Sequence, residues 1–283
     1  MNAVSTIPSA VEISDAEFDA ITAIAVREAG LAIPKSKKSL VQSRIARRFR
    51  SLKISNCQDY LALLADSPDE TRELISVLTT NVSSFFREAH HFEFLRQTII
   101  PRLRETLAKG QPARIWSAGC SSGQEPYSIA IEIAKAFPDA AQQDLLILAS
   151  DIDPKILDKA RSGIYQPQDL EAVSPDDRHR FFTATEDGSE GARVSDELKR
   201  LIRFRELNLH GEWPIKARFD VIFCRNVVIY FDDDHQKQLW PRFRERLTDS
   251  GWLILGHSER IQETEASGFT SAGVTVYQRK SEN

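Results

Sequence analysis

The stretch ARIWSAGCSSGQEP at residues 113–126 predicts a buried strand, a tight turn of small residues and the first turn of a helix. Small residues in such a turn let the backbone bend sharply and let a ligand approach closely, so Gly119 is a candidate binding residue. The Gly-x-x-x-Gly spacing alone is equally typical of an ordinary strand–helix connection. The prediction of a ligand therefore depends on the segments that follow.

Strands and helices alternate after this turn. Strands are expected at 145–149, 219–224, 251–256 and 274–277, and helices at 126–137, from Pro154 onward and at 235–247. This alternation predicts an α/β fold for residues 113–283, with a doubly wound, Rossmann-like sheet. The stretch at about 181–206, including a β-type segment at 201–204, interrupts the alternation and predicts a small antiparallel β-subdomain insertion.

Residues 14–80 predict an N-terminal all-helical domain, and residues 81–112 a linker followed by a helix. Ser14 and Glu17 have the capping-box spacing that opens a helix. A second helix is expected over 37–52, because an apolar stripe at helical spacing is formed by Val41, Ile45, Phe49 and Leu52. Shorter helices are expected at 60–64 and 71–78.

The composition, 41% hydrophobic and 28% charged, is typical of a globular protein in water. No apolar run approaches the ~20 residues that span a bilayer. The first basic residue is Arg27, so the N-terminus lacks the charged region of a signal peptide. The three cysteines, Cys57, Cys120 and Cys224, are far apart and lack metal-ligand spacing. We therefore expect reduced thiols, no metal site, no membrane insertion and a cytoplasmic location.

Basic residues are concentrated in one region of the chain. Residues 27–53 contain nine Lys or Arg and a single acid, Glu28, so their formal charge is +8, whereas the whole chain carries −4. Arg44, Arg47 and Arg48 follow an i, i+3, i+4 spacing beside the apolar stripe. This pattern predicts either an ordinary solvated helix face or a surface that meets an acidic partner.

Polar residues follow two of the expected strands, at the edge where open α/β sheets bind ligands. Asp151 can accept hydrogen bonds from both hydroxyls of a ribose, although a nicotinamide enzyme would use the same device. The first turn lacks the Gly-x-Gly-x-x-Gly order, which disfavours a dinucleotide. Asp153 is the better helix N-cap before Pro154. Asn226 can form a hydrogen bond to an adenine edge or to a methionine moiety. An enzyme that acts on a DNA base would be expected to have an Asn-Pro-Pro-Tyr type loop here, so the absence of prolines argues against a DNA base as acceptor.

Taken together, five segments resemble the chemotaxis receptor glutamate O-methyltransferases, the CheR family. They are TTNVSSFFREAHHF at 79–92, WSAGCSSGQEPYS at 116–128, ASDID at 149–153, FCRNVVIYF at 223–231 and GHSE at 256–259. These segments are the most specific part of a resemblance that extends from about residue 14 to 278. The resemblance implies an N-terminal receptor-docking domain and a Rossmann-like catalytic domain that binds S-adenosyl-L-methionine. It also implies an inserted β-subdomain, which docks a receptor tether in some members.

The resemblance also implies which residues hold the cofactor. They are Asn81, Ser83 and Arg87 in the linker, Glu125 and Asp151 at the first strand ends, and Asn208, Leu209, Arg225, Asn226 and Val227 in later loops. Ser83 stands where the family often has Thr, and it keeps the hydroxyl. Gln124 stands where many members have Glu, so Glu125 is the one acid of that pair.

The implied reaction transfers a methyl group to glutamate side chains of a bacterial chemoreceptor in chemotaxis adaptation, leaving S-adenosyl-L-homocysteine. A glutamate carboxylate, with a pKa of about 4.3, is ionised at neutral pH and needs no general base. Arg87 and Tyr230 are the candidates for orienting it, and a rival role for Arg87 is to pair with the carboxylate of the cofactor. Arg44, Arg47 and Arg48 would dock the acidic receptor helices.

Two other functions fit parts of the sequence. An RNA methyltransferase would use the basic helix for phosphate contacts, but Phe49 is the one aromatic residue among those charges and the rest of the chain is acidic. A signalling module could bind the cofactor without using it, although the intact Arg87 and Tyr230 argue for an enzyme. A nucleic-acid partner is therefore not expected.

Overall fold

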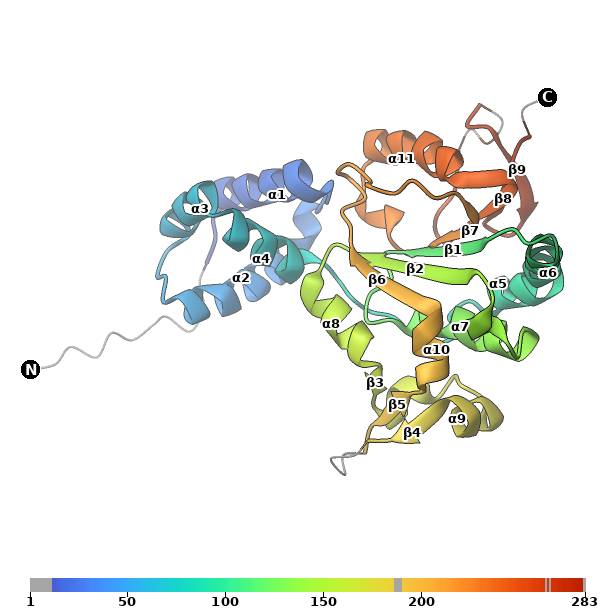
Figure 1. The fold of residues 1–283 in the computed structure, drawn as a ribbon. Coiled ribbons are helices and arrows are strands. Elements are labelled where there is room, and N and C mark those ends of the chain that lie inside the picture. Colours follow the sequence, from blue (N-terminus) through green and yellow to red (C-terminus); the bar gives the residue numbers. More distant parts are fainter. Residues whose placement is uncertain (1–11, 186–189, 263, 265, 282–283) are drawn as a thin grey trace, which may run out of the picture. The chain divides into compact units, whose positions relative to one another are not determined.

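The computed structural model describes residues 12–185, 190–262, 264 and 266–281 (Figure 1). The chain divides into two compact units, one formed by residues up to Thr80 with Tyr230–Asp232, the other by Asn81–Ile229 with the chain from Asp233 onward. Among the described residues, no helix combines the length and the apolar character needed to cross a bilayer. The three cysteines are buried and unpaired, as expected.

The first unit is helical. It contains α1 (Asp15–Ala29), a 3-10 turn (Lys35–Lys37), α2 (Lys38–Leu52), α3 (Cys57–Asp66) and α4 (Pro68–Leu78). The predicted capping box is confirmed, since the Ser14 side chain accepts from the Glu17 N–H while the Ser14 N–H donates to the Glu17 carboxylate at 2.7 Å. The predicted stripe on α2 is confirmed for Val41, Ile45 and Phe49, which are buried.

The second unit contains a seven-stranded sheet in the order β6-β2-β1-β7-β8-β10-β9. Its strands are β1 (Ala113–Ala118), β2 (Leu145–Asp151), β6 (Ile202–Glu206), β7 (Phe219–Cys224), β8 (Leu247–Leu255), β9 (Phe269–Gly273) and β10 (Val276–Arg279). The pairs from β6 to β8 are parallel, and β10 runs antiparallel to β8 and β9. The predicted Rossmann-like fold is confirmed. The strand order reverses between β1 and β7, which is where such sheets bind their ligands.

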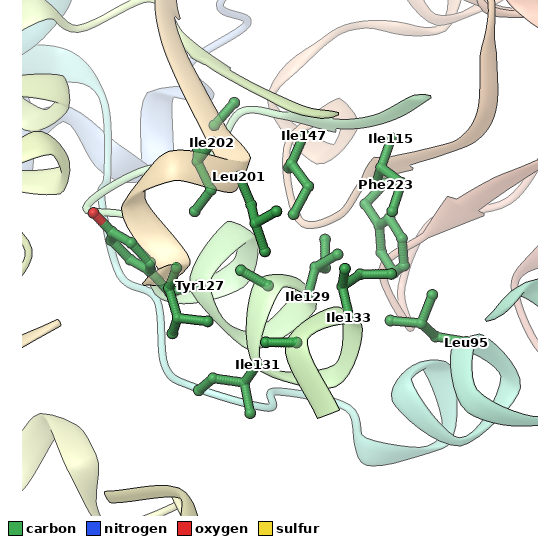
Figure 2. Packing of buried hydrophobic residues seen from close by; sticks show 14 of the residues in the cluster. Leu95, Ile115, Tyr127, Ile129, Ile131, Ile133, Ile147, Leu201, Ile202 and Phe223 are labelled. Carbon is green, nitrogen blue, oxygen red and sulfur yellow. The ribbon is translucent and has the colours of Figure 1, made fainter. Parts of the chain in front are cut away.

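Helices cover both faces of this sheet. They are α5 (Ala89–Phe94), a π-helical segment (Leu95–Ile99), α6 (Ile100–Ala108), α7 (Gln124–Ala136), α8 (Pro154–Ser162), α10 (Asp196–Leu201) and α11 (Asp233–Arg246), with 3-10 turns at Ala140–Gln142, Pro167–Leu170 and Val228–Tyr230. Ile129 and Ile133 of α7 pack toward Ile115 of β1 (Figure 2). On the other face, the ring of Trp116 lies 5.7 Å from that of Phe243 in α11. Alternate residues of β1 are therefore buried on opposite sides.

The predicted insertion is a separate three-stranded antiparallel sheet in the order β3-β5-β4. Its strands are β3 (Ile164–Tyr165), β4 (Phe182–Ala184) and β5 (Ala192–Val194), and α9 (Pro175–Phe181) precedes β4. One assignment was wrong, because the segment at 201–204 belongs to the main sheet, where Ile202 pairs in register with Ile147 of β2. The small sheet also begins at Ile164, earlier than expected. Alternating burial identifies a strand but cannot identify its partner.

Candidate cofactor and acceptor site

The turn after β1 is held against the ends of its neighbours. The N–H groups of Gly119 and Cys120 both donate to the carbonyl of Ser150 at 2.8 Å. Gly119 has a φ of +77°, and a Cβ on it would lie 2.3 Å from Cγ2 of Val227. The left-handed φ and the close packing of the Val227 side chain thus favour glycine here. It also brings together two predicted cofactor residues that are far apart in the sequence.

Asp151 ends β2 and is 7% exposed. One oxygen accepts from the Ser121 N–H at 2.8 Å and the other from the Asp153 N–H at 3.1 Å. Burial raises the pKa of Asp151, and these two backbone bonds oppose the rise. Each carboxylate oxygen can accept a second hydrogen bond. The remaining acceptor capacity of the carboxylate therefore fits the two hydroxyls of a ribose, which would donate to it.

Asn81 is tied to the same strand end. Its Nδ2 donates to Asp153 at 3.1 Å, while the other oxygen of Asp153 accepts from the Lys155 N–H at 3.0 Å and caps α8. The prediction that Asp153 is the N-cap is confirmed. Ser83, two residues after Asn81, is half-buried.

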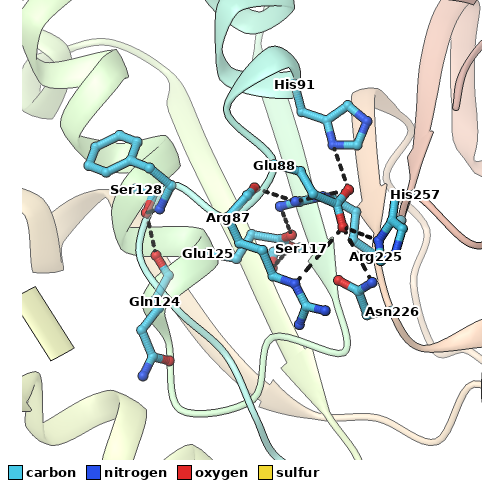
Figure 3. A network of polar contacts seen from close by, with 12 residues as sticks. Arg87, Glu88, His91, Ser117, Gln124, Glu125, Ser128, Arg225, Asn226 and His257 are labelled. Carbon is cyan, nitrogen blue, oxygen red and sulfur yellow. Dashed lines mark hydrogen bonds and ion pairs between the residues drawn. The ribbon is translucent and has the colours of Figure 1, made fainter. Parts of the chain in front are cut away.

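Glu125 is buried in the first turn of α7 and binds two protein groups (Figure 3). Its carboxylate accepts from the Ser117 hydroxyl at 2.7 Å and pairs with Nη1 of Arg225 at 3.0 Å. Burial raises the pKa of Glu125, and the positive charge of Arg225 opposes the rise. The carboxylate is therefore held at the carboxyl edge of the sheet, between β1 and β7.

Arg225 follows β7, and its side chain is 2% exposed. The guanidinium lies between two carboxylates, 3.0 Å from Glu125 and 3.3 Å from Glu88. Its Nη2 also donates to the backbone carbonyl of Arg87. These contacts use the side chain of Arg225 within the protein and fasten the linker at Arg87 to the end of β7. A direct contact from this guanidinium to a cofactor stays a prediction.

The carboxylate of Glu88 contacts several polar side chains near the linker (Figure 3). Its carboxylate lies 3.0 Å from His257 Nδ1, 3.4 Å from Asn226 Nδ2 and 3.4 Å from His91 Nδ1. Burial alone would raise the pKa of Glu88, but the charge of Arg225 and the bond from His257 lower it to about 2. Glu88, His90 and His91 have ligand atoms within 4.8 Å of one another. Because Arg225 already supplies the countercharge to Glu88, this group needs no cation for its stability.

Arg87 itself is loosely held, with a side chain that is 35% exposed. Its Nη1 donates to the carbonyl of Val82 at 3.4 Å, and its Nε lies 3.9 Å from Glu88. A guanidinium carries five N–H donors, so most of its capacity is open to an anionic ligand. Its backbone is fixed by Arg225 whereas its head group is not.

The loop after β6 carries Asn208 and Leu209. The Asn208 side chain accepts from the His210 N–H at 2.9 Å, and the carbonyl of Leu209 accepts from Arg242 of α11 at 2.7 Å. The Arg242 guanidinium stacks on Trp213, 4.1 Å from the ring centre. Arg242 of α11 therefore holds this loop in place.

Tyr230 belongs to the helical unit, where its carbonyl accepts from the Ala32 N–H at 2.8 Å. Its expected partnership with Arg87 stays a prediction.

The three arginines of α2 differ in their surroundings. Arg44 donates from Nη1 to the carbonyls of Val77, Leu78 and Thr79 at 3.1, 2.7 and 2.9 Å, which caps the end of α4. Arg48 pairs with the buried Glu70, at 2.7 Å from Nε to Oε1. Arg47 is exposed. Two of the three arginines predicted to dock a partner, Arg44 and Arg48, thus stabilise the helical unit. Arg47 is the best candidate for docking.

The sequence predicted no role for two carboxylates of the site, the half-buried Glu88 and the buried Glu259. Glu259 is 3% exposed and accepts from backbone N–H groups at the ends of β7 and β8. Both residues lie inside quoted motifs, at 79–92 and 256–259, which was the available signal. A motif does not say whether a carboxylate contacts a ligand or other parts of the protein.

The Rossmann-like fold and the polar groups at the carboxyl edge of the sheet fit an S-adenosylmethionine-dependent methyltransferase, and the match to a family model assigns this class. The protein-family model described as "CheR methyltransferase, SAM binding domain" matches residues 81–277. A second family model, "CheR methyltransferase, all-alpha domain", matches residues 16–79. The chain belongs to the CheR methyltransferase family.

Named relatives cover most of this chain. A probable chemotaxis protein methyltransferase of Rhizobium etli is 46% identical over 88% of this chain and 94% of its own length. A chemotaxis protein methyltransferase of Escherichia coli is 39% identical over 94% of this chain and 91% of its own. A TehB-like methyltransferase structure from Corynebacterium glutamicum is more remote, with 14% identity, a TM-score of 0.35 and coverage of 66% of this chain and 98% of its own. The family assignment rests on the two family models and on the first two relatives.

Proposed function

We propose that this chain is a protein-glutamate O-methyltransferase acting on the cytoplasmic signalling domain of bacterial chemoreceptors. The methyl group of S-adenosyl-L-methionine passes to a glutamate side chain, giving a glutamate 5-O-methyl ester and S-adenosyl-L-homocysteine in chemotaxis adaptation. The observation that carries the proposal concerns Arg87. Its backbone carbonyl is held by Arg225, whereas most N–H donors of its guanidinium remain available to bind an anion. The names of the relatives, which are chemotaxis protein methyltransferases, support a role in chemotaxis. A cytoplasmic location is part of the proposal.

The chemistry asks little of the protein beyond placement. A carboxylate oxygen forms a bond to the methyl carbon as the sulfur–carbon bond breaks, and no proton moves. The opposite charges of sulfonium and carboxylate cancel in the transition state, so an environment that excludes water favours the step. Arg87 would bind the acceptor carboxylate bidentately, and Tyr230 would donate to its second oxygen. The rival role of Arg87 is to pair with the carboxylate of the cofactor.

Receptor docking would use the exposed basic residues of the α2 region. Arg47 and Arg50 lie three residues apart on α2, Lys53 follows it, and all three are exposed. Acidic receptor helices would meet this charge by electrostatic attraction, which raises the association rate more than the final affinity. In this proposal Arg44 and Arg48 stabilise the helical unit that carries these residues.

The deciding assay uses tritiated S-adenosyl-L-methionine and membranes that carry the receptor. Alkali should release the label as volatile methanol, because carboxyl methyl esters are base-labile. Arg87→Ala should remove most of this signal, whereas Arg102→Ala, an exposed arginine of α6, should keep it. Label that alkali leaves in non-volatile form on nucleotides released from RNA would refute the proposal in favour of a nucleic-acid acceptor. Cofactor binding without any transfer would instead favour the signalling module.

A further inference from the structure

Glu259 binds an unusual number of backbone groups for a buried side chain. One carboxylate oxygen accepts from the N–H groups of Asn226 at 2.8 Å and Gly256 at 2.6 Å. The other accepts from those of Val227 at 2.8 Å and Ile229 at 3.2 Å. Three of the four donors come from the loop that follows β7. The side chain lies in a different segment, the turn that follows β8.

The loop after β7 is shaped as an anion-binding concavity. Asn226 has a φ of +60°, and this left-handed residue turns neighbouring N–H groups toward one side. Successive N–H groups arranged in this way form a nest that attracts negative charge. Here the protein fills the nest with its own carboxylate, so the loop conformation depends on the ionised form of Glu259.

Gly256 brings the two segments into backbone contact. A Cβ at this position would lie 2.8 Å from the Asn226 backbone nitrogen, 2.6 Å from Asn226 Nδ2 and 2.8 Å from the Glu259 carboxylate. No side chain fits there without moving the loop. Glycine at 256 and glutamate at 259 therefore act together on the same loop.

This arrangement limits how the loop can meet a ligand. The amides of Asn226 and Val227 are already used by Glu259, so cofactor contacts from these residues must come from side chains or carbonyls. The Asn226 side chain contacts Glu88, at 3.4 Å from Nδ2 to the carboxylate. Val227 packs where a Cβ of Gly119 would be. Glu259 thus fixes the backbone from which both side chains project.

We propose that Glu259 is a positioning residue for methyl transfer, which sets the loop 226–229 so that Asn226 and Val227 meet S-adenosyl-L-methionine. Glu259 touches neither reactant and acts through this loop. The inference rests on the proposed function, because it assumes that the loop borders the cofactor.

The main test is Glu259→Gln. The amide keeps one accepting oxygen, but its NH₂ group faces two N–H donors that then lose their acceptor. Hydrogen bonds to charged groups are worth enough that the dissociation constant of S-adenosyl-L-homocysteine should rise roughly tenfold to a hundredfold. The KM for S-adenosyl-L-methionine should rise while the KM for receptor stays unchanged. A purely structural loss would instead lower the amount of active enzyme and leave both KM values alone.

Glu132→Gln is the matched control, since Glu132 is a buried carboxylate of α7 whose partners are the side chains of Arg96 at 3.2 Å and Lys135 at 3.4 Å. It should keep the wild-type affinity. Gly256→Ala displaces the same loop without removing a charge and should weaken binding as well, which provides a second result if Glu259→Gln does not fold. Wild-type dissociation constants in the folded Glu259→Gln or Gly256→Ala proteins would overturn the inference. Failure of the wild-type protein to bind would overturn the proposed function itself.

Discussion

Replacing Arg225 with methionine should strongly destabilise the second unit of the chain. The guanidinium is 2% exposed and lies 3.0 Å from Glu125 and 3.3 Å from Glu88. Removing one partner of a buried ion pair costs about 3–5 kcal/mol, because the remaining charge is left without compensation. For a domain of roughly 150–250 residues, each kcal/mol lowers the melting temperature by about 2–4 °C. We therefore expect the melting temperature to fall by about 6–20 °C.

The loss should also depend on pH. In the wild type the pKa of Glu88 is about 2 instead of 4.5. Stability from this lowered pKa is fully present above about pH 4.5 and is lost as the pH falls toward 2, up to about 3 kcal/mol. Without Arg225 the carboxyls of Glu88 and Glu125 would favour protonation, and stability would be lost as the pH rises through their raised pKa values. The deficit of the variant should thus be larger at pH 8 than at pH 5.

The assay is thermal unfolding of wild type and variant at several values between pH 5 and pH 8. Arg96→Met serves as control, since Arg96 is 47% exposed and its pair with Glu132 should contribute about 1 kcal/mol or less. A loss below about 1 kcal/mol for the Arg225 variant, or a loss equal at all pH values, would refute the argument from a buried, shared countercharge.

Four further predictions concern binding and folding. Asp151→Ala should weaken S-adenosyl-L-homocysteine binding by roughly a hundredfold in calorimetry, since two charge-assisted bonds are lost; equal affinity would remove Asp151 from the ribose. Arg47→Glu should raise the KM for receptor while cofactor affinity stays constant, and unchanged receptor kinetics would contradict its docking role. Arg48→Glu should instead lower the melting temperature of the helical unit, since it opposes Glu70 with a like charge. Gly119→Ala should destabilise the fold by about 1–3 kcal/mol in denaturant titration, because its Cβ meets Val227.

Local elements were predictable because their signals lie within a few residues. The capping box at Ser14 depends on a partner three positions away, and the stripe of Val41, Ile45 and Phe49 on a helical period. The strands at β1, β2 and β7 were recognised from short apolar runs bounded by small or polar residues. The polar strand ends at Asp151 and Asn226 followed from the rule that parallel strands present their carboxyl ends at one edge.

The arrangement of charge was decided by contacts far apart along the chain. Arg225 meets Glu125 and the carbonyl of Arg87 over separations of 100 and 138 residues, and Arg44 meets the end of α4 over more than 30. The same holds for β6, whose place beside β2 depended on topology. Periodicity and propensity act over one or two turns of chain, whereas ion pairs and hydrogen bonds depend on distance in space. Residue types and motifs therefore revealed the class of chemistry, and folding alone determined which charges hold the site together and which stay free for a ligand.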